Sequence, residues 1–225
     1  MELLQRLMPN VLAKPGELWS SCVETFYMVA IPGVISFVLG LLFGVLLTVC
    51  APGRVLENKL VFTVLDKVTN VFRSIPFIIL LAALIPYTRL IVGTAIGTKG
   101  AMMPLVFGTV PFFSRQVETA LAEVDNGLIE AAQSMGSSPW EITLRIYLRE
   151  SIPGIVRGST ITIVSLIGLT AMAGAVGGGG LGDFAIRYGH QRNQIDVTYA
   201  TVVILVAAVS IIQAIGMRIV RRTTH

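Results

Sequence analysis

Charged side chains are scarce in this sequence. Of its 225 residues, 13% are charged and 54% are hydrophobic, whereas roughly a quarter of the residues in a soluble domain are charged. So few polar groups cannot cover a water-facing surface, and the hydrophobic excess must therefore face lipid. The composition excludes an ordinary soluble protein and predicts an integral membrane protein embedded in the lipid bilayer.

Metal ligands and basic clusters are scarce as well. The only cysteines, Cys22 and Cys50, lie in or beside apolar stretches, and the only histidines are His190 and His225. Neither a disulfide framework, a metal site nor a Ser-His-Asp catalytic site is expected from so few side chains. The 17 Lys and Arg residues are scattered along the chain, so nucleic-acid binding is not expected either.

A nucleotide-binding loop is also missing. The motif G-x-x-x-x-G-K-[ST] does not occur, and the glycine cluster at 177–180 lacks the Lys-Ser/Thr end that would contact phosphates. The glycines there favour a tight turn instead. The chain is therefore predicted to be no enzyme and to bind no cofactor; if it belongs to a pump, another polypeptide must hydrolyse ATP.

Long apolar runs are what the sequence has in place of these features. About 20 apolar residues in a helix span the roughly 30 Å hydrocarbon core of a bilayer. Three charge-free windows and two with charges near their ends predict five transmembrane helices, at about 25–53, 68–88, 101–121, 158–182 and 197–217. The predicted fold class is all-α integral membrane, with an interfacial extracytoplasmic segment at 1–20, a membrane domain at 21–215 and a basic tail at 216–225.

The distribution of basic residues predicts the orientation. If the N-terminus is outside, 11 of the 17 Lys and Arg residues lie on the inner side and crowd the membrane boundary, as the positive-inside rule expects. The C-terminus and residues 125–150 then face the cytoplasm.

Residues 125–150, DNGLIEAAQSMGSSPWEITLRIYLRE, differ from the rest of the chain because they are polar. Asp125 is a good N-cap for a helix that runs to Met135, and Gly136 suits the left-handed residue after a helix. A second helix then starts at Ser138-Pro139, with Glu141 completing a capping box. The sequence predicts two short amphipathic helices joined by a glycine turn.

Each of these helices has an apolar side that needs a partner. The predicted sides consist of Leu128, Ala131, Ala132 and Met135 in the first helix, and of Trp140, Leu144, Tyr147 and Leu148 in the second. From physical chemistry alone, two partners are equally reasonable: the helix bundle of this chain, or a soluble protein that docks on the loop.

The loop also carries a family pattern. EAA at 130–132, Gly136, Ile146 and Leu148 have the spacing of the EAA loop, and this part of the sequence resembles the binding-protein-dependent ABC importer permeases. Arg149 stands where that family has proline. The resemblance implies a type I ABC importer permease fold in which this loop is a coupling helix seated on an ATPase. The residues implied in coupling are Glu130, Ala131, Ala132, Met135, Gly136, Pro139, Trp140, Leu144, Ile146 and Leu148.

Three further segments are similar to the permeases of bacterial methionine importers: FRSIPFIILL at 72–81, TRLIVGTAIG at 88–97 and AMAGAVGGGGLGDFAIRYG at 171–189. This similarity implies ATP-driven import of methionine, of both enantiomers, across the bacterial inner membrane. It also implies the partners: a second copy of the chain, two ATPase subunits that hold ATP and Mg, and an extracytoplasmic methionine-binding protein.

Three alternatives stay open. One is a permease of the same type for another small solute. Another is a secondary transporter or channel, although the predicted spans lack the internal acids that ion coupling would need, apart from Glu118 near one end. The third is a membrane scaffold that contains no path.

The translocation path is predicted from small and flexible residues. Met172 lies mid-span between Thr170 and Gly174, where a flexible thioether could close a narrow passage, although filling the core is the other reading. Ser74, Pro76 and Phe77 of the second predicted span complete the predicted path.

Overall fold

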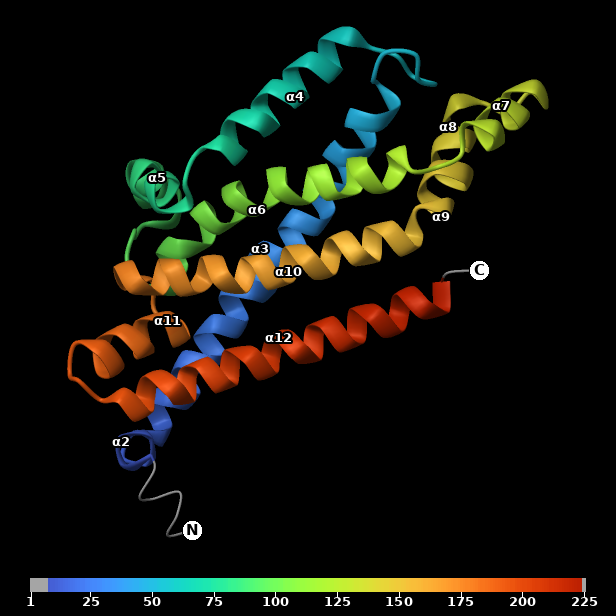
Figure 1. Ribbon diagram of the computed structural model, residues 1–225. Coiled ribbons are helices and arrows are strands. Elements are labelled where there is room, and N and C mark those ends of the chain that lie inside the picture. The colour runs from blue at the N-terminus through green and yellow to red at the C-terminus, as the bar shows by residue number, and fades with distance from the viewer. Residues whose placement is uncertain (1–7, 224–225) are drawn as a thin grey trace. The chain divides into compact units, whose positions relative to one another are not determined.

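The computed structural model describes residues 8–223, and the regular secondary structure in this range is entirely helical (Figure 1). The predicted all-α class is confirmed. Of the segment predicted at 1–20, residues 1–7 lie outside the described residues, and Pro9 begins a helical turn. The elements are α2 (Pro9–Leu12), α3 (Pro15–Val49), α4 (Lys59–Ser74), α5 (Phe77–Val92), α6 (Gly97–Ala122), α7 (Asn126–Ser134), α8 (Pro139–Ile142), η1 (Thr143–Tyr147), α9 (Leu148–Glu150), α10 (Ile152–Ala173), η2 (Gly174–Gly178), α11 (Gly180–Phe184), η3 (Ala185–His190) and α12 (Ile195–Thr223).

Within residues 8–223, three helices are long and apolar enough to cross a membrane: α3, α10 with η2, and α12. Helix α3 begins at Pro15 rather than near residue 25, so both Glu17 and Glu24 lie within it. The third predicted span lies within α6, a single helix of 26 residues.

The second predicted span, 68–88, is not one helix, and this prediction was wrong. Helix α4 ends at Ser74, α5 begins at Phe77, and the two are bent by 108°. Ile75 between them is extended, with φ −83° and ψ 122°, because a residue before proline is pushed out of the helical region. Apolar content alone did not reveal that Pro76 breaks the helix.

The chain divides into two compact units, each assembled from parts of the same long helices. Unit 1 consists of Met1–Val34, Pro76–Phe107 and Ile163–Ile212, and unit 2 consists of Ile35–Ile75, Gly108–Thr162 and Gln213–His225. Residues 125–150 belong wholly to unit 2, while the glycine-rich segment near residue 178 belongs to unit 1.

In unit 2, α6 packs closely against α3. A Cβ on Gly40 would lie 2.7 Å from the Phe113 ring, and one on Gly44 would lie 2.5 Å from the Val117 side chain. Only glycine therefore permits this approach, as the Gly40/Gly44 spacing predicts.

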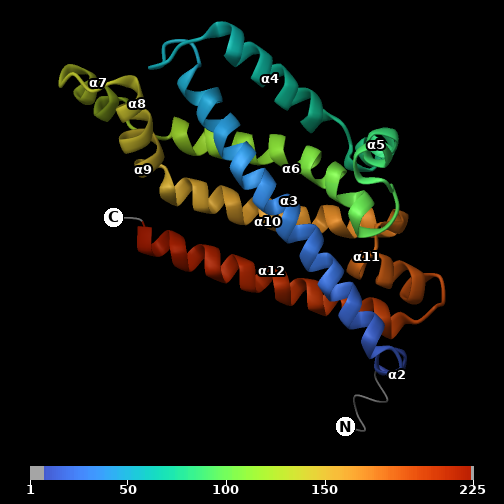
Figure 2. The same cartoon turned by 180° about the vertical axis from the view of Figure 1, so that it is seen from behind.

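Glycines spaced four residues apart also bring α10 close to α6. Gly154 and Gly158 of α10 lie against Ala120 and Gln116, where an added Cβ would come within 2.8 Å. The last part of α12 lies beside the first part of α10 (Figure 2). There, Gly216 of α12 lies against Thr160 of α10. Unit 2 is thus a tightly packed body around α6.

Unit 1 contains the glycine-rich turn. Gly177, Gly179 and Gly180 all have positive φ, between 74° and 90°, a conformation that costs other residues free energy. The N–H of Gly180 donates to the Glu24 carboxylate at 2.7 Å, and the N–H of Leu181 donates to the Thr25 hydroxyl at 2.8 Å. Two side chains of α3 therefore cap the start of α11.

Candidate functional site

The loop at 125–150 begins as predicted. Asp125 caps α7 because its carboxylate accepts a hydrogen bond from the N–H of Gly127 at 2.8 Å. Gly136 has φ +80°, and the N–H of Ser137 reaches back to the carbonyl of Ala132 at 3.0 Å. Both the N-cap and the left-handed glycine turn are confirmed.

The second helix starts with the predicted capping box. The Glu141 carboxylate accepts from the N–H of Ser138 at 3.0 Å and from its hydroxyl at 2.8 Å, and Pro139 occupies the first helical position. Hydrogen bonds from the Ser138 backbone and side chain, together with the charge of Arg145, hold the pKa of Glu141 below its usual value. Local interactions therefore hold the start of the second helix.

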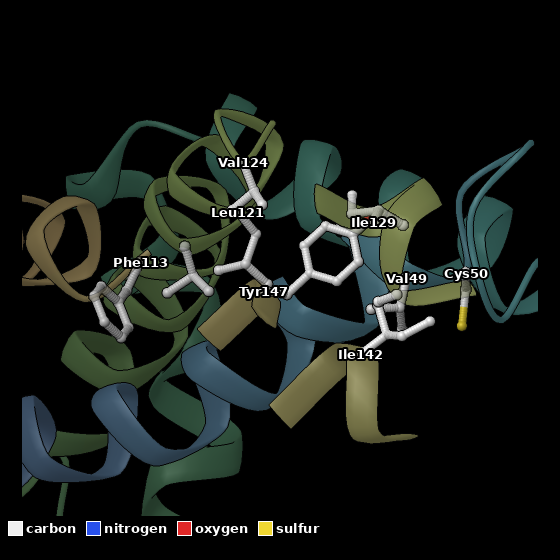
Figure 3. Packing of buried hydrophobic residues seen from close by; sticks show 10 residues of the cluster. Val49, Cys50, Phe113, Leu121, Val124, Ile129, Ile142 and Tyr147 are labelled. Carbon is white, nitrogen blue, oxygen red and sulfur yellow. The ribbon is translucent and has the colours of Figure 1, made fainter. Parts of the chain in front are cut away.

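One side of the loop packs into the core of unit 2. Ile129 and Ala132 of α7, with Ile142 and Tyr147 of the second helix, join a buried cluster that also contains Val49, Cys50, Phe113, Val117, Leu121 and Val124. Figure 3 shows the Tyr147 ring, which is fully buried, close to Leu121 and Ile129. The loop is therefore held rigidly against the ends of α3 and α6.

A polar interaction strengthens this attachment. Arg54, in the turn after α3, donates one hydrogen bond to Oδ1 of Asn126 at 2.9 Å and another to the Tyr147 hydroxyl at 3.3 Å. Beside it lies a pocket of about 440 Å³, lined by Pro52, Gly53, Arg54, Val55, Asn126, Ile129, Glu130, Gln133 and Tyr147. Arg54 was not predicted as part of this site because its partners are 72 and 93 residues away in the sequence.

The other side of the loop leaves large apolar side chains exposed. Met135 is 79% exposed and Trp140 is 64% exposed, and Leu128 and Leu144 are exposed as well. We call these four residues the exposed apolar set. Large apolar side chains gathered on one exposed surface are typical of an interaction site for another protein or a membrane.

The predicted division of apolar faces was partly wrong. Ala132 is buried whereas Ala131 and Met135 are exposed, and Tyr147 is buried whereas Trp140 and Leu144 are exposed. In the second helix, the reason is the π-helical segment η1, whose wider turn moves Tyr147 away from the face that Trp140 and Leu144 share. One side of the loop therefore packs against the helices of this chain, as one of the two alternatives expects, and the other side leaves an apolar face exposed; docking of a soluble protein on that face stays a prediction.

The remaining residues of the predicted coupling site fall into two groups. Glu130, Ala131, Gly136 and Pro139 are exposed, whereas Ile146 and Leu148 are half-buried. Arg149, in the position of the family's proline, continues the helix through α9, and the chain turns only at Ser151 before α10 begins. Proline is therefore not needed for this turn.

The predicted path residues are not gathered on one face. Ser74, Pro76 and Met172 are exposed, and Phe77, Thr170 and Gly174 are buried. The Thr170 hydroxyl donates to the carbonyl of Ile167 at 2.7 Å, while Gly174 lies against the backbone of Asp183. Of the three residues on α10 and η2, only Met172, at 43% exposure, presents its side chain to the surface.

Comparison with known proteins gives consistent matches over most of the chain. The family described as binding-protein-dependent transport system inner membrane component matches residues 36–225. The "Probable D-methionine transport system permease protein MetI" of Vibrio cholerae is 50% identical over 202 residues, 90% of each chain. The "Methionine import system permease protein MetP" of Bacillus subtilis is 44% identical over 214 residues, 95% of this chain and 96% of that protein. Among solved structures, a chain of the MetNI methionine ABC transporter in an inward-facing conformation is 44% identical, with a TM-score of 0.91 over 95% of this chain and 99% of that one.

Proposed function

The chain belongs to the family of binding-protein-dependent transport system inner membrane components, and from this membership we propose that it is the membrane-spanning permease subunit of an ATP-driven methionine importer. The observation that supports methionine as the substrate is the sequence identity of 44–50% to proteins named as methionine permeases, over at least 90% of this chain. The chain is a transport component and not an enzyme.

The assembly that we propose contains two copies of this chain, two ATPase subunits that bind ATP and Mg, and an extracytoplasmic methionine-binding protein. The N-terminus lies outside the inner membrane and the C-terminus in the cytoplasm. Both enantiomers of methionine are substrates.

The exposed apolar set is the surface on which the ATPase docks. Met135 and Trp140 protrude from a loop whose opposite side is fixed in the core of unit 2, so a force applied to them acts on α3 and α6 rather than bending the loop. ATP binding closes the ATPase pair, moves the docked loops and favours the outward-open arrangement; hydrolysis favours the inward-open one. Met172, with its flexible side chain exposed on α10, acts as a gate residue along the path.

Reconstitution tests the proposal. The complex in proteoliposomes, supplied with the binding protein and internal ATP, takes up labelled methionine, and both unlabelled enantiomers compete. If the complex prefers another solute, methionine is wrong as the substrate, although the assignment as a permease still holds. Uptake in the absence of ATP would contradict an ATP-driven importer.

The docking surface has its own test. Met135→Asp combined with Trp140→Asp places two charges in the proposed interface, so the ATPase is lost on purification. Ala122→Asp adds one such charge at an exposed position outside the exposed apolar set and keeps the ATPase bound, and the single variants Met135→Asp and Trp140→Asp are compared with it charge for charge. If the double variant retains the ATPase and transports as well as the control, this docking surface is wrong.

A further inference from the structure

Helix α4 carries two exposed stripes of opposite character. The polar stripe, at spacings of four, three and four residues, consists of Thr63, Lys67, Asn70 and Ser74. The apolar stripe beside it consists of Leu60, Val64, Val68 and Val71. Each spacing places the members of its stripe on one helical face, so α4 presents two adjacent exposed faces away from the rest of unit 2.

The third side of α4 fixes how the helix is rotated about its axis. Arg115 of α6 forms an ion pair with the Asp66 carboxylate and donates to Oδ1 of Asn70 at 2.9 Å. Its other terminal nitrogen bonds to Glu118 at 2.6 Å. The Arg115 side chain is only 17% exposed, and separating a partly buried charge from its partners is costly. The other three members of the polar stripe therefore stay turned outward, and Asn70 lies at the border between this stripe and the side of α4 that contacts α6.

The polar stripe needs water. Helices α4 and α5 together form a candidate broken span, and polar side chains at membrane depth face protein or a water-filled cavity rather than lipid. Lys67 has no ion-pair partner within residues 8–223, so its ammonium group must be hydrated. The apolar stripe, by contrast, can face lipid or another apolar surface.

We propose that the polar stripe of α4 lines the water-filled exit of the translocation path, on the side where residues 125–150, the coupling loop, lie. This inference rests on the proposed function, since it needs a path for the stripe to line. The location follows from the chain: α4 starts after the turn that holds Arg54, and Arg54 bonds to Asn126 and Tyr147 of the coupling loop. A movement of that loop is therefore passed through Arg54 to the turn from which α4, and with it the polar stripe, begins.

The chemistry of the stripe suits an amino-acid substrate. It offers two hydroxyls and an ammonium group, since the Asn70 amide already bonds to Asp66 and to Arg115. The nearby carboxylates of Asp66 and Glu118 are both paired with Arg115. A zwitterionic amino acid can replace its bound water molecules with these groups one at a time. Its own carboxylate is not repelled, because these two acidic side chains are already paired. Weak, serial contacts of this kind let a solute enter and also leave.

Cysteine accessibility tests the proposal. Single variants Thr63→Cys and Ser74→Cys sample the polar stripe, and Val64→Cys and Val71→Cys are matched controls on the apolar stripe. The complete complex in proteoliposomes reacts with a membrane-impermeant, positively charged thiosulfonate applied from the ATPase side, and the parent gives the background of Cys22 and Cys50. We expect modification of the polar-stripe cysteines to be about tenfold faster or more, since only a hydrated thiol ionises readily.

Nucleotide dependence separates a path from a helix lying at the lipid headgroups. Trapping the ATPase with ATP and vanadate closes the cytoplasmic exit, so modification at residues 63 and 74 slows, whereas a headgroup helix would react at the same rate in both states. Equal rates for the two stripes, or no effect of trapping, overturn the inference. A parent complex that transports no methionine would instead refute the proposed substrate, and the contrast between the stripes would still report on the path.

Discussion

Arg54 donates to the hydroxyl of Tyr147, 93 residues further along the chain, at a distance of 3.3 Å. The same guanidinium nitrogen also donates to Asn126 at the start of α7. One side chain thus connects the turn after α3 with the first and the second helix of the coupling loop. A displacement of the loop must carry the end of α3 with it or break these bonds.

Removing this connection should uncouple transport from hydrolysis. We expect Arg54→Ala to keep the ATPase bound, because the exposed apolar set is untouched, but to consume more ATP per methionine imported. Tyr147→Phe keeps the buried ring and removes one hydrogen bond worth about 1 kcal/mol, so its effect should be in the same direction and smaller. Parallel assays of uptake and phosphate release measure the ratio. An unchanged ratio in Arg54→Ala would show that the core packing alone transmits the movement.

Backbone strain should make Gly136 sensitive to the shape of its replacement. Its φ is +80°, and a Cβ placed there meets nothing within 4 Å, so the cost is purely conformational. Gly136→Val should destabilise the turn by about 1–3 kcal/mol, whereas Gly136→Asn should be milder because asparagine tolerates the left-handed region. Thermal unfolding and ATPase co-purification measure both effects. Equal behaviour of the two variants would mean that the turn relaxes out of this conformation.

The features that the sequence predicted correctly are local ones. Asp125, Gly136 and the Ser138–Glu141 box each interact within a few residues, so their spacing is sufficient. The exposed position of Trp140 relative to Tyr147 depends on a π-helical turn, and periodicity of 3.6 residues cannot anticipate it.

Hydrogen-bond partners that are far apart in the sequence could not be predicted. Glu24 and Thr25 bond to Gly180 and Leu181, which lie 156 residues away, and no local pattern marks the α3 residues as caps. Pro76 lies inside the second predicted span. A proline alone does not tell whether a helix ends, since Pro32 lies inside the unbroken α3 whereas α4 and α5 are separated at Pro76.

Helix spacing in unit 2 should depend on Gly44 and not on Gly33 of unit 1. A Cβ on Gly44 would lie 2.7 Å from the carbonyl oxygen of Ser114, which is backbone and cannot move aside, whereas a Cβ on Gly33 would lie 3.6 Å from the Leu166 side chain. Gly44→Ala should therefore lower the midpoint of thermal unfolding of the purified complex. Gly33→Ala should leave the midpoint unchanged or raise it, because alanine favours the helix by about 1 kcal/mol over glycine. A Gly44→Ala complex as stable as the parent would show that α3 and α6 can move apart without loss.

The glycine-rich turn should depend on the two side chains that cap it. Removing the Glu24 carboxylate leaves the N–H of Gly180 without its acceptor, and an unsatisfied buried donor costs about 1–3 kcal/mol. We expect Glu24→Ala to lower the unfolding midpoint more than Glu24→Gln, because the amide oxygen still accepts a hydrogen bond from Gly180. Thr25→Val preserves the shape of the side chain but removes the acceptor for the N–H of Leu181, so it should weaken the same turn. Since Gly177, Gly179 and Gly180 all adopt positive φ, nothing in their own conformational preferences would hold the turn once the caps are gone. Faster proteolysis near residues 177–182 in the variants would locate the loosening there, and cleavage rates equal to those of the parent would mean that packing of Phe184 against its neighbours holds the turn without the caps.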